Sequence, residues 1–391
     1  MPDPIIVEAE IHEFEYEQKG LEVDEGGFNL VYRAGVSLVG KAFVVRLLTD
    51  AGITGEYVCR RRVEAMGVSE AWGYLKGKNA LQRERIYNDL CRGFSMVAQA
   101  GIGPVDIALW DIAGKYHGVP VYKLLGGYKE SFPCYASTYH GDHSGGLDSP
   151  QAYAEFAVRC KEMGYPAFKI HGWPDGSIGR EIATIHAVRK AVGDELELML
   201  DPACELKTFA DALWVGRACD DARFYWYEDP FRDGGISQFA HRKLRQLIST
   251  PLLITEHVRT VEQRMDFAIA EATDFVRGDP DYNGITGTMK LAHACEALGL
   301  DVQIHDVSPA VRQCMAAIRN TNYYEMALVH PKEEVSALLP AELYVDYRDG
   351  LDVIDDKGHV SVPQGPGLGV QINWEFVKQH TTSVAVLSQD D

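Results

Sequence analysis

The sequence predicts an α/β protein in which a parallel barrel follows a smaller α+β domain. From about residue 130 onward, eight short apolar segments alternate with seven segments of helical spacing, joined by short connections. This alternation is typical of a closed parallel barrel. An open, doubly wound sheet is the alternative, but such a sheet favours a GxGxxG turn after its first strand, and none is present there.

Residues 1–127 are predicted to form the α+β domain. Segments 4–16 and 41–58 alternate apolar and polar residues, as strands of an antiparallel sheet do. Between them, residues 18–37 are rich in glycine, charged and aromatic residues, which predicts a mobile loop. Apolar residues at helical spacing predict helix within 80–117.

Residues 128–350 contain the repeat of the predicted barrel. Its expected strands are 132–138, 166–171, 196–201, 223–228, 252–256, 273–279, 301–305 and 322–329. Its expected helices are 149–164, 178–192, 207–220, 237–249, 259–272, 285–298 and 308–318. Residues 351–391 form a tail, and the short alternating runs over 350–374 are expected to rejoin the N-terminal sheet. The final SQDD is expected to fray.

Three acidic residues each close a short apolar run. Asp201 ends LELMLD, Glu228 ends FYWYE and Glu256 ends LLITE. The spacings, 228 − 201 = 27 and 256 − 228 = 28 residues, each fit one strand, one helix and two loops. In neighbouring parallel strands these carboxylates would converge and repel one another unless a hard cation such as Mg²⁺ lies between them. One such acid more often caps a helix or faces water, but three in successive units favour a metal site.

Other predicted strand ends supply groups for acid–base chemistry. Lys169 and His171 are two residues apart on one strand, so both face the barrel axis. A lysine in an apolar strand is seldom buried without a partner. His305 ends the seventh strand and is followed by Asp306, while Glu325 lies in the eighth. A histidine at a strand end is more often structural, and Glu325 could simply pair with an arginine.

This set suits removal of a proton next to a carboxylate. The product is an enediolate with a second negative charge, which a divalent cation stabilises. One face would supply the base and the opposite face the acid; both assignments of Lys169/His171 and His305 stay open, and we favour Lys169 or His171 as the base. Lys169 should keep the His171 imidazole neutral, and an aspartate behind His305 would fix its tautomer. Glu325, kept protonated by burial, would donate to the enediolate oxygen.

Composition limits the partners and the compartment. A net charge of −19 and a pI near 5.1 argue against nucleic acid or an anionic membrane as partner. No apolar run reaches the roughly 18 residues of a membrane span, and the N-terminus lacks a signal pattern. Eight scattered cysteines without CxxC are typical of a reduced, cytoplasmic protein. Cys204 stands out because it lies three residues after Asp201.

Over nearly its whole length the chain resembles the enolase superfamily, within its mandelate racemase subgroup. Segment 103–127 (GPVDIALWDIAGKYHGVPVYKLLGG) is similar to the family's connection from cap to barrel, WYEDP at 226–230 to its fourth-strand metal motif, and GITG at 284–287 to its GGxTG motif. The resemblance implies a modified (β/α)7β TIM barrel with an α+β cap formed by the N-terminal segment and the C-terminal tail. It also implies that 18–37 closes over the substrate, and that the protein is a homo-oligomer between dimer and octamer.

The resemblance assigns roles residue by residue. Asp201, Glu228 and Glu256 match the family's Mg²⁺ ligands, and this superfamily pairs Lys or His bases with Mg²⁺. Lys169 matches the first lysine of the second-strand Lys-x-Lys motif, and His171 stands where the second lysine would be.

On the other flank, His305 matches the seventh-strand histidine. Glu325, 325 − 305 = 20 residues later, matches the eighth-strand acid. Alignment on the strand DFVRGD makes Asp279 the aspartate partner of His305, whereas alignment on GITG places Gly278 there. We prefer Asp279, because strands tolerate shifts less well than loops.

Three departures from the family pattern bear on function. His171 replaces a lysine that is itself a base in mandelate-type racemisation, which argues against that reaction. Ala203 replaces the usual Asn two residues after the first ligand, and His257 replaces the Asn that often follows the third. Both changes indicate an altered environment around the metal ligands and an unusual small carboxylate substrate.

The leading hypothesis is a Mg²⁺-dependent dehydratase of a sugar acid, an aldonate or aldarate, which forms a 2-keto-3-deoxy acid. The alternative is a racemase, epimerase or cycloisomerase on a related carboxylate, which would exchange the α-proton without losing water. A third hypothesis is a catalytically retired member that binds a ligand; loss of Mg²⁺ binding in the folded protein would support it.

Overall fold

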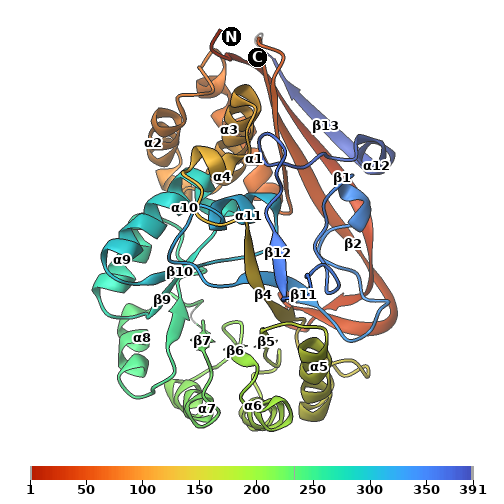
Figure 1. The fold of residues 1–391 in the computed structure, drawn as a ribbon, viewed down its shortest axis with the longest axis vertical. Helices are drawn as coiled ribbons and strands as arrows, with labels where there is room; N and C mark the ends of the chain where they lie inside the picture. Colours follow the sequence, from red (N-terminus) through yellow and green to blue (C-terminus); the bar gives the residue numbers. More distant parts are fainter. Residues whose placement is uncertain (1, 233, 389–391) are drawn as a thin grey trace.

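The computed structural model describes residues 2–232 and 234–388. The expected fraying of SQDD falls mainly on 389–391, which lie outside these ranges. An antiparallel sheet belongs to a cap, and a curled, mostly parallel sheet forms the barrel (Figure 1). Within the described ranges, no helix has both the length and the apolar character needed to cross a membrane.

The cap combines an antiparallel sheet with helices α1 to α4. Its strands, in spatial order, are β13 (Thr381–Leu387), β1 (Ile6–Val23), β2 (Leu30–Thr49) and β3 (Thr54–Cys59). Its helices are α1 (Arg62–Leu75), α2 (Arg83–Gly93), α3 (Ile102–His117) and α4 (Val121–Leu124). The single strand expected over 41–58 is two strands, because a turn at 50–53 reverses the chain. The helix expected within 80–117 is divided into α2 and α3.

The prediction of a mobile loop over 18–37 is wrong, because β1 and β2 extend through most of this segment as one long hairpin. The ladder continues to the pairing of Val23 with Leu30, so only 24–29 lie outside the strands. Along β1, buried Tyr16, Gln18 and Gly20 alternate with exposed Glu17 and Lys19, which is the pattern of a half-buried strand. Composition hid this alternation, because the polar face contributes most of the residues.

The tip of this hairpin reaches the barrel. The two strands run from the cap along the side of the barrel (Figure 1). At the tip, Asn29 Nδ2 donates to Glu205 Oε1 on the β6–α7 loop at 3.2 Å. Val31 forms a bridge with His140, which follows the first barrel strand. The hairpin therefore contacts the rim where the carboxyl ends of the strands lie.

The barrel sheet has the strand order β10-β9-β8-β7-β6-β5-β4-β11, and each of these pairs is parallel. The strands are β4 (Ser131–Thr138), β5 (Ala167–His171), β6 (Glu197–Asp201), β7 (Trp226–Glu228), β8 (Leu252–Ile254), β9 (Phe275–Gly278), β10 (Asp301–Ile304) and β11 (Tyr324–Val329). Each lies inside its expected segment or within one residue of it. The predicted α/β fold class is confirmed.

The expected closure of the barrel is not complete. In the ranges that the structure describes, β10 and β11 end the sheet without a ladder between them. Other contacts join them instead. The Asp306 backbone N–H donates to Glu325 Oε2 at 3.2 Å, and Asn322 Nδ2 donates to Asp301 Oδ2 at 3.1 Å. The sheet is thus a curled, TIM-like half-barrel whose carboxyl strand ends still share one rim.

Helices cover the outside of the sheet, close to where the periodicity places them. They are α5 (Pro150–Glu162), α6 (Ile178–Val192), α7 (Phe209–Asp221), α8 (Gln238–Arg245), α9 (Val261–Ile269), α10 (Pro280–Ala297) and α11 (Pro309–Met315). The largest difference is α10, which was expected to begin at 285. It begins at Pro280 and is kinked at Gly284, whose φ is 66°.

The cap docks on the barrel where α3 meets α10. A Cβ on Gly284 would lie 2.4 Å from the Asp106 carboxylate, and one on Gly103 would lie 1.9 Å from the Asp281 carbonyl. Asp106 accepts hydrogen bonds from the Thr286 N–H at 2.9 Å and its hydroxyl at 2.6 Å. Two of the quoted motifs thus meet at this close approach, which only glycine permits.

The tail returns to the cap as expected, but through a later segment than 350–374. Within 350–374, β12 (His359–Ser361) pairs antiparallel with β4 in the barrel and not with the N-terminal sheet. The later strand β13 returns to the cap and pairs with β1, after α12 (Trp374–His380). Short alternating runs predict strands but carry no information about the partner.

Inside the barrel, an apolar layer lies beneath a charged one. Buried Ala167, Met199 and Trp226 form a cluster with Leu253 and Tyr135. Two residues further along their strands, on the same face, come the side chains of the charged layer, Lys169, Asp201 and Glu228. The apolar layer provides a rigid, dry floor for charges at the carboxyl rim.

Candidate active site at the carboxyl rim of the barrel

Asp201, Glu228 and Glu256 meet at the ends of β6, β7 and β8. Each offers one oxygen, and these oxygens all lie within 4.8 Å of one another. Asp201 and Glu228 are buried, and Glu256 is half-buried. The Ala203 N–H donates to Asp201 Oδ1 at 2.7 Å, which fixes this carboxylate on its loop. An all-oxygen donor set of this kind fits Mg²⁺, which prefers carboxylate ligands.

Lys169 lies against this triad from β5. Its ammonium Nζ is 3.0 Å from Glu228 Oε2, 2.9 Å from Glu325 Oε1 and 3.4 Å from Asp201 Oδ2. Burial by itself would lower the pKa of Lys169, but the charges of Glu228 and Glu325 outweigh it and raise that pKa well above its usual value. Lys169 is therefore a fixed positive charge.

Arg277, on β9, provides a second buried cation. Its Nη2 donates to Glu325 Oε2 at 2.7 Å, and its Nε lies 3.0 Å from Glu228 Oε1. Burial disfavours its charge, but Glu228 and the other nearby acids raise its pKa well above the usual range. Arg277 lies within the predicted strand 273–279 and was given no role there. The signal that marked Lys169, a charge inside an apolar strand, applies to Arg277 as well.

His171 is held in one orientation by Thr138. Its Nδ1 lies 2.6 Å from the Thr138 carbonyl, which can only accept, so Nδ1 carries a hydrogen and donates it. The His171 backbone N–H donates to the Thr138 hydroxyl at 3.0 Å. The other ring nitrogen, Nε2, faces the rim 3.3 Å from Asp201 Oδ2. His171 thus points its second nitrogen toward the carboxylate cluster.

His305 lies on the opposite flank with Asp279. Its Nδ1 donates to Asp279 Oδ2 at 2.9 Å, and its Nε2 is 3.4 Å from Glu256 Oε1. Burial opposes the charged imidazole, but Glu256 and Asp279 together raise the pKa of His305. The structure places Asp279, and not Gly278, against the histidine. Asp306 instead pairs with Arg60 from the cap.

The carboxyl groups of the triad differ in their ionisation. Burial raises the pKa of Glu228 to about 7, against the opposing charges of Arg277 and Lys169. Burial acts in the same direction on Asp201, but Lys169 and His171 outweigh it and lower the pKa. A cation bound among these oxygens would favour the ionised form of all three.

The expectation that burial keeps Glu325 protonated is wrong. Burial does push its pKa upward, but Lys169 and Arg277 lower that pKa well below the ordinary value. Each of its two oxygens meets one of these cations, and the Ser137 hydroxyl donates to Oε1 at 2.9 Å. Glu325 is an ionised residue that holds the two cations in place.

Arg60 is a further residue near the site that the sequence did not indicate. It follows β3 in the cap, and its guanidinium pairs with Asp306 beside His305. The run Arg60–Arg62 ends an apolar strand, but a strand pattern in the cap does not show that its end reaches the barrel.

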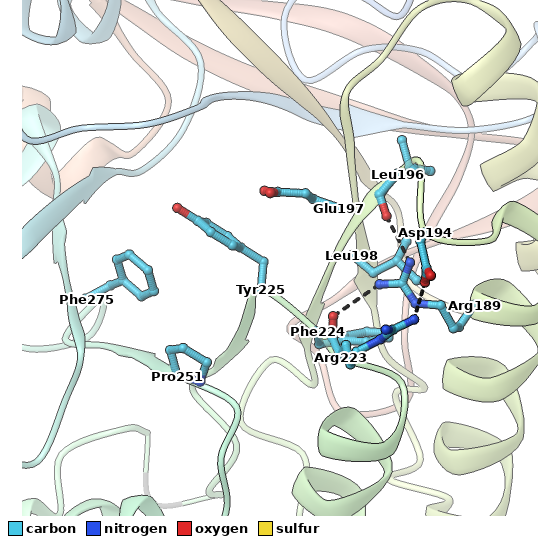
Figure 2. A pocket seen from close by; sticks show the side chains of 10 residues that line it. All are labelled: Arg189, Asp194, Leu196, Glu197, Leu198, Arg223, Phe224, Tyr225, Pro251 and Phe275. Carbon is cyan, nitrogen blue, oxygen red and sulfur yellow. Dashed lines mark hydrogen bonds and ion pairs between the residues drawn. The ribbon is translucent and has the colours of Figure 1, made fainter.

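A cavity of about 430 Å³ lies at the opposite end of the barrel. It opens at the amino ends of the strands, where Glu197, Tyr225 and Phe275 project toward the same space (Figure 2). Arg189 and Arg223 beside it bind backbone carbonyls and Asp194, so their charges secure loops. The wall lacks the converging carboxylates of the other rim, which is why we place the chemistry at the carboxyl ends.

The fold is a TIM-like barrel with a cluster of carboxylates at its carboxyl rim, which is where barrel enzymes carry their active sites. Residues 152–376 match the family model of the enolase C-terminal domain-like proteins. Residues 39–126 match the N-terminal domain of the mandelate racemase and muconate lactonizing enzymes. The chain belongs to the enolase superfamily, in the mandelate racemase/muconate lactonizing enzyme subgroup.

Similar proteins carry out more than one reaction. A D-xylonate dehydratase of Haloferax volcanii is 26% identical, over 89% of this chain and 87% of its own length. A D-galactarolactone cycloisomerase of Agrobacterium fabrum is 30% identical, over 84% of this chain and 88% of its own. The crystal structure of a D-glucarate dehydratase from Agrobacterium tumefaciens, complexed with magnesium, has a TM-score of 0.84 and 27% identity, covering 97% of this chain and 99% of that one.

Proposed function

We propose that the protein removes the proton α to a carboxylate with the help of Mg²⁺, and that the reaction is the dehydration of a sugar acid to a 2-keto-3-deoxy acid. The observation that carries the proposal is the placement of proton-transfer groups on both flanks of the triad. Lys169 and His171 come from β5 and His305 from β10, with β6 to β9 between them. A substrate held over the triad would therefore meet one set on each face.

Asp201, Glu228 and Glu256 would hold the Mg²⁺. When bound there, Mg²⁺ would hold the substrate carboxylate and stabilise the charge that develops on it. Its donor oxygens come from three adjacent strand ends above an apolar floor, so the site is stiff.

On the β5 flank, His171 is the proposed base. Its Nδ1–H is committed to the Thr138 carbonyl, which leaves Nε2 to take the α-proton. Lys169 stays an ammonium, so its charge stabilises the enediolate that forms. The two residues therefore have different roles: His171 accepts the proton, and Lys169 supplies a positive charge.

On the β10 flank, His305 is the proposed acid. Asp279 holds its Nδ1–H and favours the imidazolium, so Nε2–H is available to protonate the departing β-hydroxyl. The proton taken by His171 and the one given by His305 balance the loss of one water.

A panel of aldonates and aldarates with Mg²⁺ tests this proposal, with detection of 2-keto acids. At least one keto acid is expected, in a reaction that a chelator stops and Mg²⁺ restores. If α-deuterium from D₂O appears in recovered sugar acids and none of them loses water, the dehydratase assignment fails.

The second candidate is a racemase, epimerase or cycloisomerase on a related carboxylate. The similarity to a D-galactarolactone cycloisomerase favours it. It needs the same base and metal but no β-leaving group, so its product would keep the mass of its substrate.

A further inference from the structure

A second group of metal-ligating side chains lies just outside the carboxylate triad. Cys204, Asp229 and His257 follow the triad residues in the same three loops, by three, one and one positions. Each offers one ligand atom, and these atoms all lie within 4.8 Å of one another. Asp229 directly follows β7 and leaves the strand conformation, with a φ of 29°.

Asp229 has no hydrogen-bond partner in the part of the chain that the structure describes. The residue is 2% exposed, and both carboxylate oxygens are buried. Neither accepts a hydrogen bond from any residue within 2–232 or 234–388. The closest cationic candidate, His257 Nε2, lies 3.8 Å from Oδ2, beyond hydrogen-bond distance. Two buried oxygens without a hydrogen-bond partner are costly unless another group, such as a bound cation, takes them.

We propose that Cys204, Asp229 and His257 bind one borderline-soft divalent cation of the Zn²⁺ class, at a site distinct from the Mg²⁺ triad. The donor set decides the class of ion, since thiolate and imidazole favour Zn²⁺ and similar transition metals, whereas the triad offers only oxygen. The inference goes beyond the proposed function and does not depend on it.

The geometry needs only a small adjustment. Ligand atoms of a tetrahedral zinc site lie roughly 3.5 Å apart, with bonds of about 2.0–2.3 Å. The His257 side chain is 41% exposed and can rotate toward the other two. Three protein ligands leave the fourth position to water, on the side where His257 meets solvent. The ion would join the loops after β6, β7 and β8, which also carry the triad.

The test uses the full chain, freed of metal by chelation and then saturated with Mg²⁺ to fill the all-oxygen site. Co²⁺ is added as a spectroscopic probe, and Zn²⁺ is used to displace it. One Co²⁺ per chain with a thiolate-to-cobalt charge-transfer band is expected. Cys204→Ser should abolish the band and weaken Zn²⁺ binding at least about tenfold, because even outer-shell changes weaken metal sites roughly 10–100-fold.

Cys91→Ser is the matched control. Cys91 is partly buried, as Cys204 is, but lies on α2 in the cap, so its loss should change nothing. His257→Ala, at an exposed position, tests a second ligand if Cys204→Ser does not fold. Equal Zn²⁺ affinity in wild type, Cys204→Ser and His257→Ala would overturn the proposal. So would a Co²⁺ spectrum without the thiolate band, which would leave Asp229 and His257 as an ion pair only.

Discussion

The two flanks of the carboxylate triad are built differently. On the β5 flank, the Lys169 side chain is 1% exposed and lies within ion-pair distance of three acids. On the β10 flank, the His305 side chain is 18% exposed and is oriented mainly by Asp279. The first flank holds a permanent positive charge beside the proposed base His171, and the second holds a histidine that Asp279 favours as the protonated acid. An enzyme that must stabilise an anion and then release water needs one flank of each kind.

The largest effect is expected at Glu228, the middle residue of the triad, which lies on a strand between the two flanks. Glu228→Gln removes the central ligand and a partner of Lys169 and Arg277. Metal stabilisation is worth several kcal/mol, so turnover should fall by roughly 10³-fold or more. Titration calorimetry with Mg²⁺ should show weakened binding. Glu197→Gln, at the opposite end of the barrel, should leave both unchanged; equal losses in the two variants would refute the assignment of the rim.

Next in size are the variants that separate the flanks. His305→Asn should lower the dehydration rate by roughly 10²–10⁴-fold, as for loss of a general acid. It should still exchange the α-proton with solvent, because His171 is untouched. Mass spectrometry of substrate recovered from D₂O measures this exchange.

His171→Asn provides the contrasting result: it should lose both dehydration and exchange. If instead His305→Asn loses exchange while His171→Asn keeps it, the base and the acid are exchanged between flanks. The β10 flank would then carry the base and the β5 flank the acid.

The charge on the β5 flank also predicts an effect on stability. Lys169→Met removes one of the two buried cations that Glu228 and Glu325 share and leaves them with Arg277, which should destabilise the metal-free protein by about 3–5 kcal/mol. Mg²⁺ should recover part of this loss by neutralising Glu228, so the rise in Tm with Mg²⁺ should be larger in the variant than in wild type. Lys161→Met, at the surface, is the control. An unchanged Tm in Lys169→Met would show that Lys169 does not offset the buried acids.

Most of the barrel and much of the site could be predicted from the sequence, because both depend on local patterns. The apolar runs located every barrel strand, and the position of Asp201, Glu228 and Glu256 at three successive strand ends brought their oxygens to one place. Asp279 could be selected as the partner of His305 because a strand fixes its register, and a loop does not.

The predictions that were wrong or incomplete concerned features that depend on contacts between distant segments. The ionisation of Glu325 is set by Lys169 and Arg277, which come from strands far away in the chain. Arg60 reaches the rim only because the cap docks there, and the strand nature of 18–37 depends on pairing that composition does not reveal. Sequence patterns locate helices and strands, but contacts with distant residues decide which side chains are ionised and which strands pair.

The smallest expected effect tests how Asp279 tunes the β10 flank. His305 must be protonated to act as acid, so dehydration should fall as pH rises through its pKa. Asp279 raises that pKa, and Asp279→Asn should therefore move the fall to lower pH. We expect a loss of roughly tenfold above neutrality and a smaller loss in mild acid, measured as kcat against pH. An equal loss at every pH would mean that Asp279 only orients the ring, and the flanks would then differ in geometry and not in proton affinity.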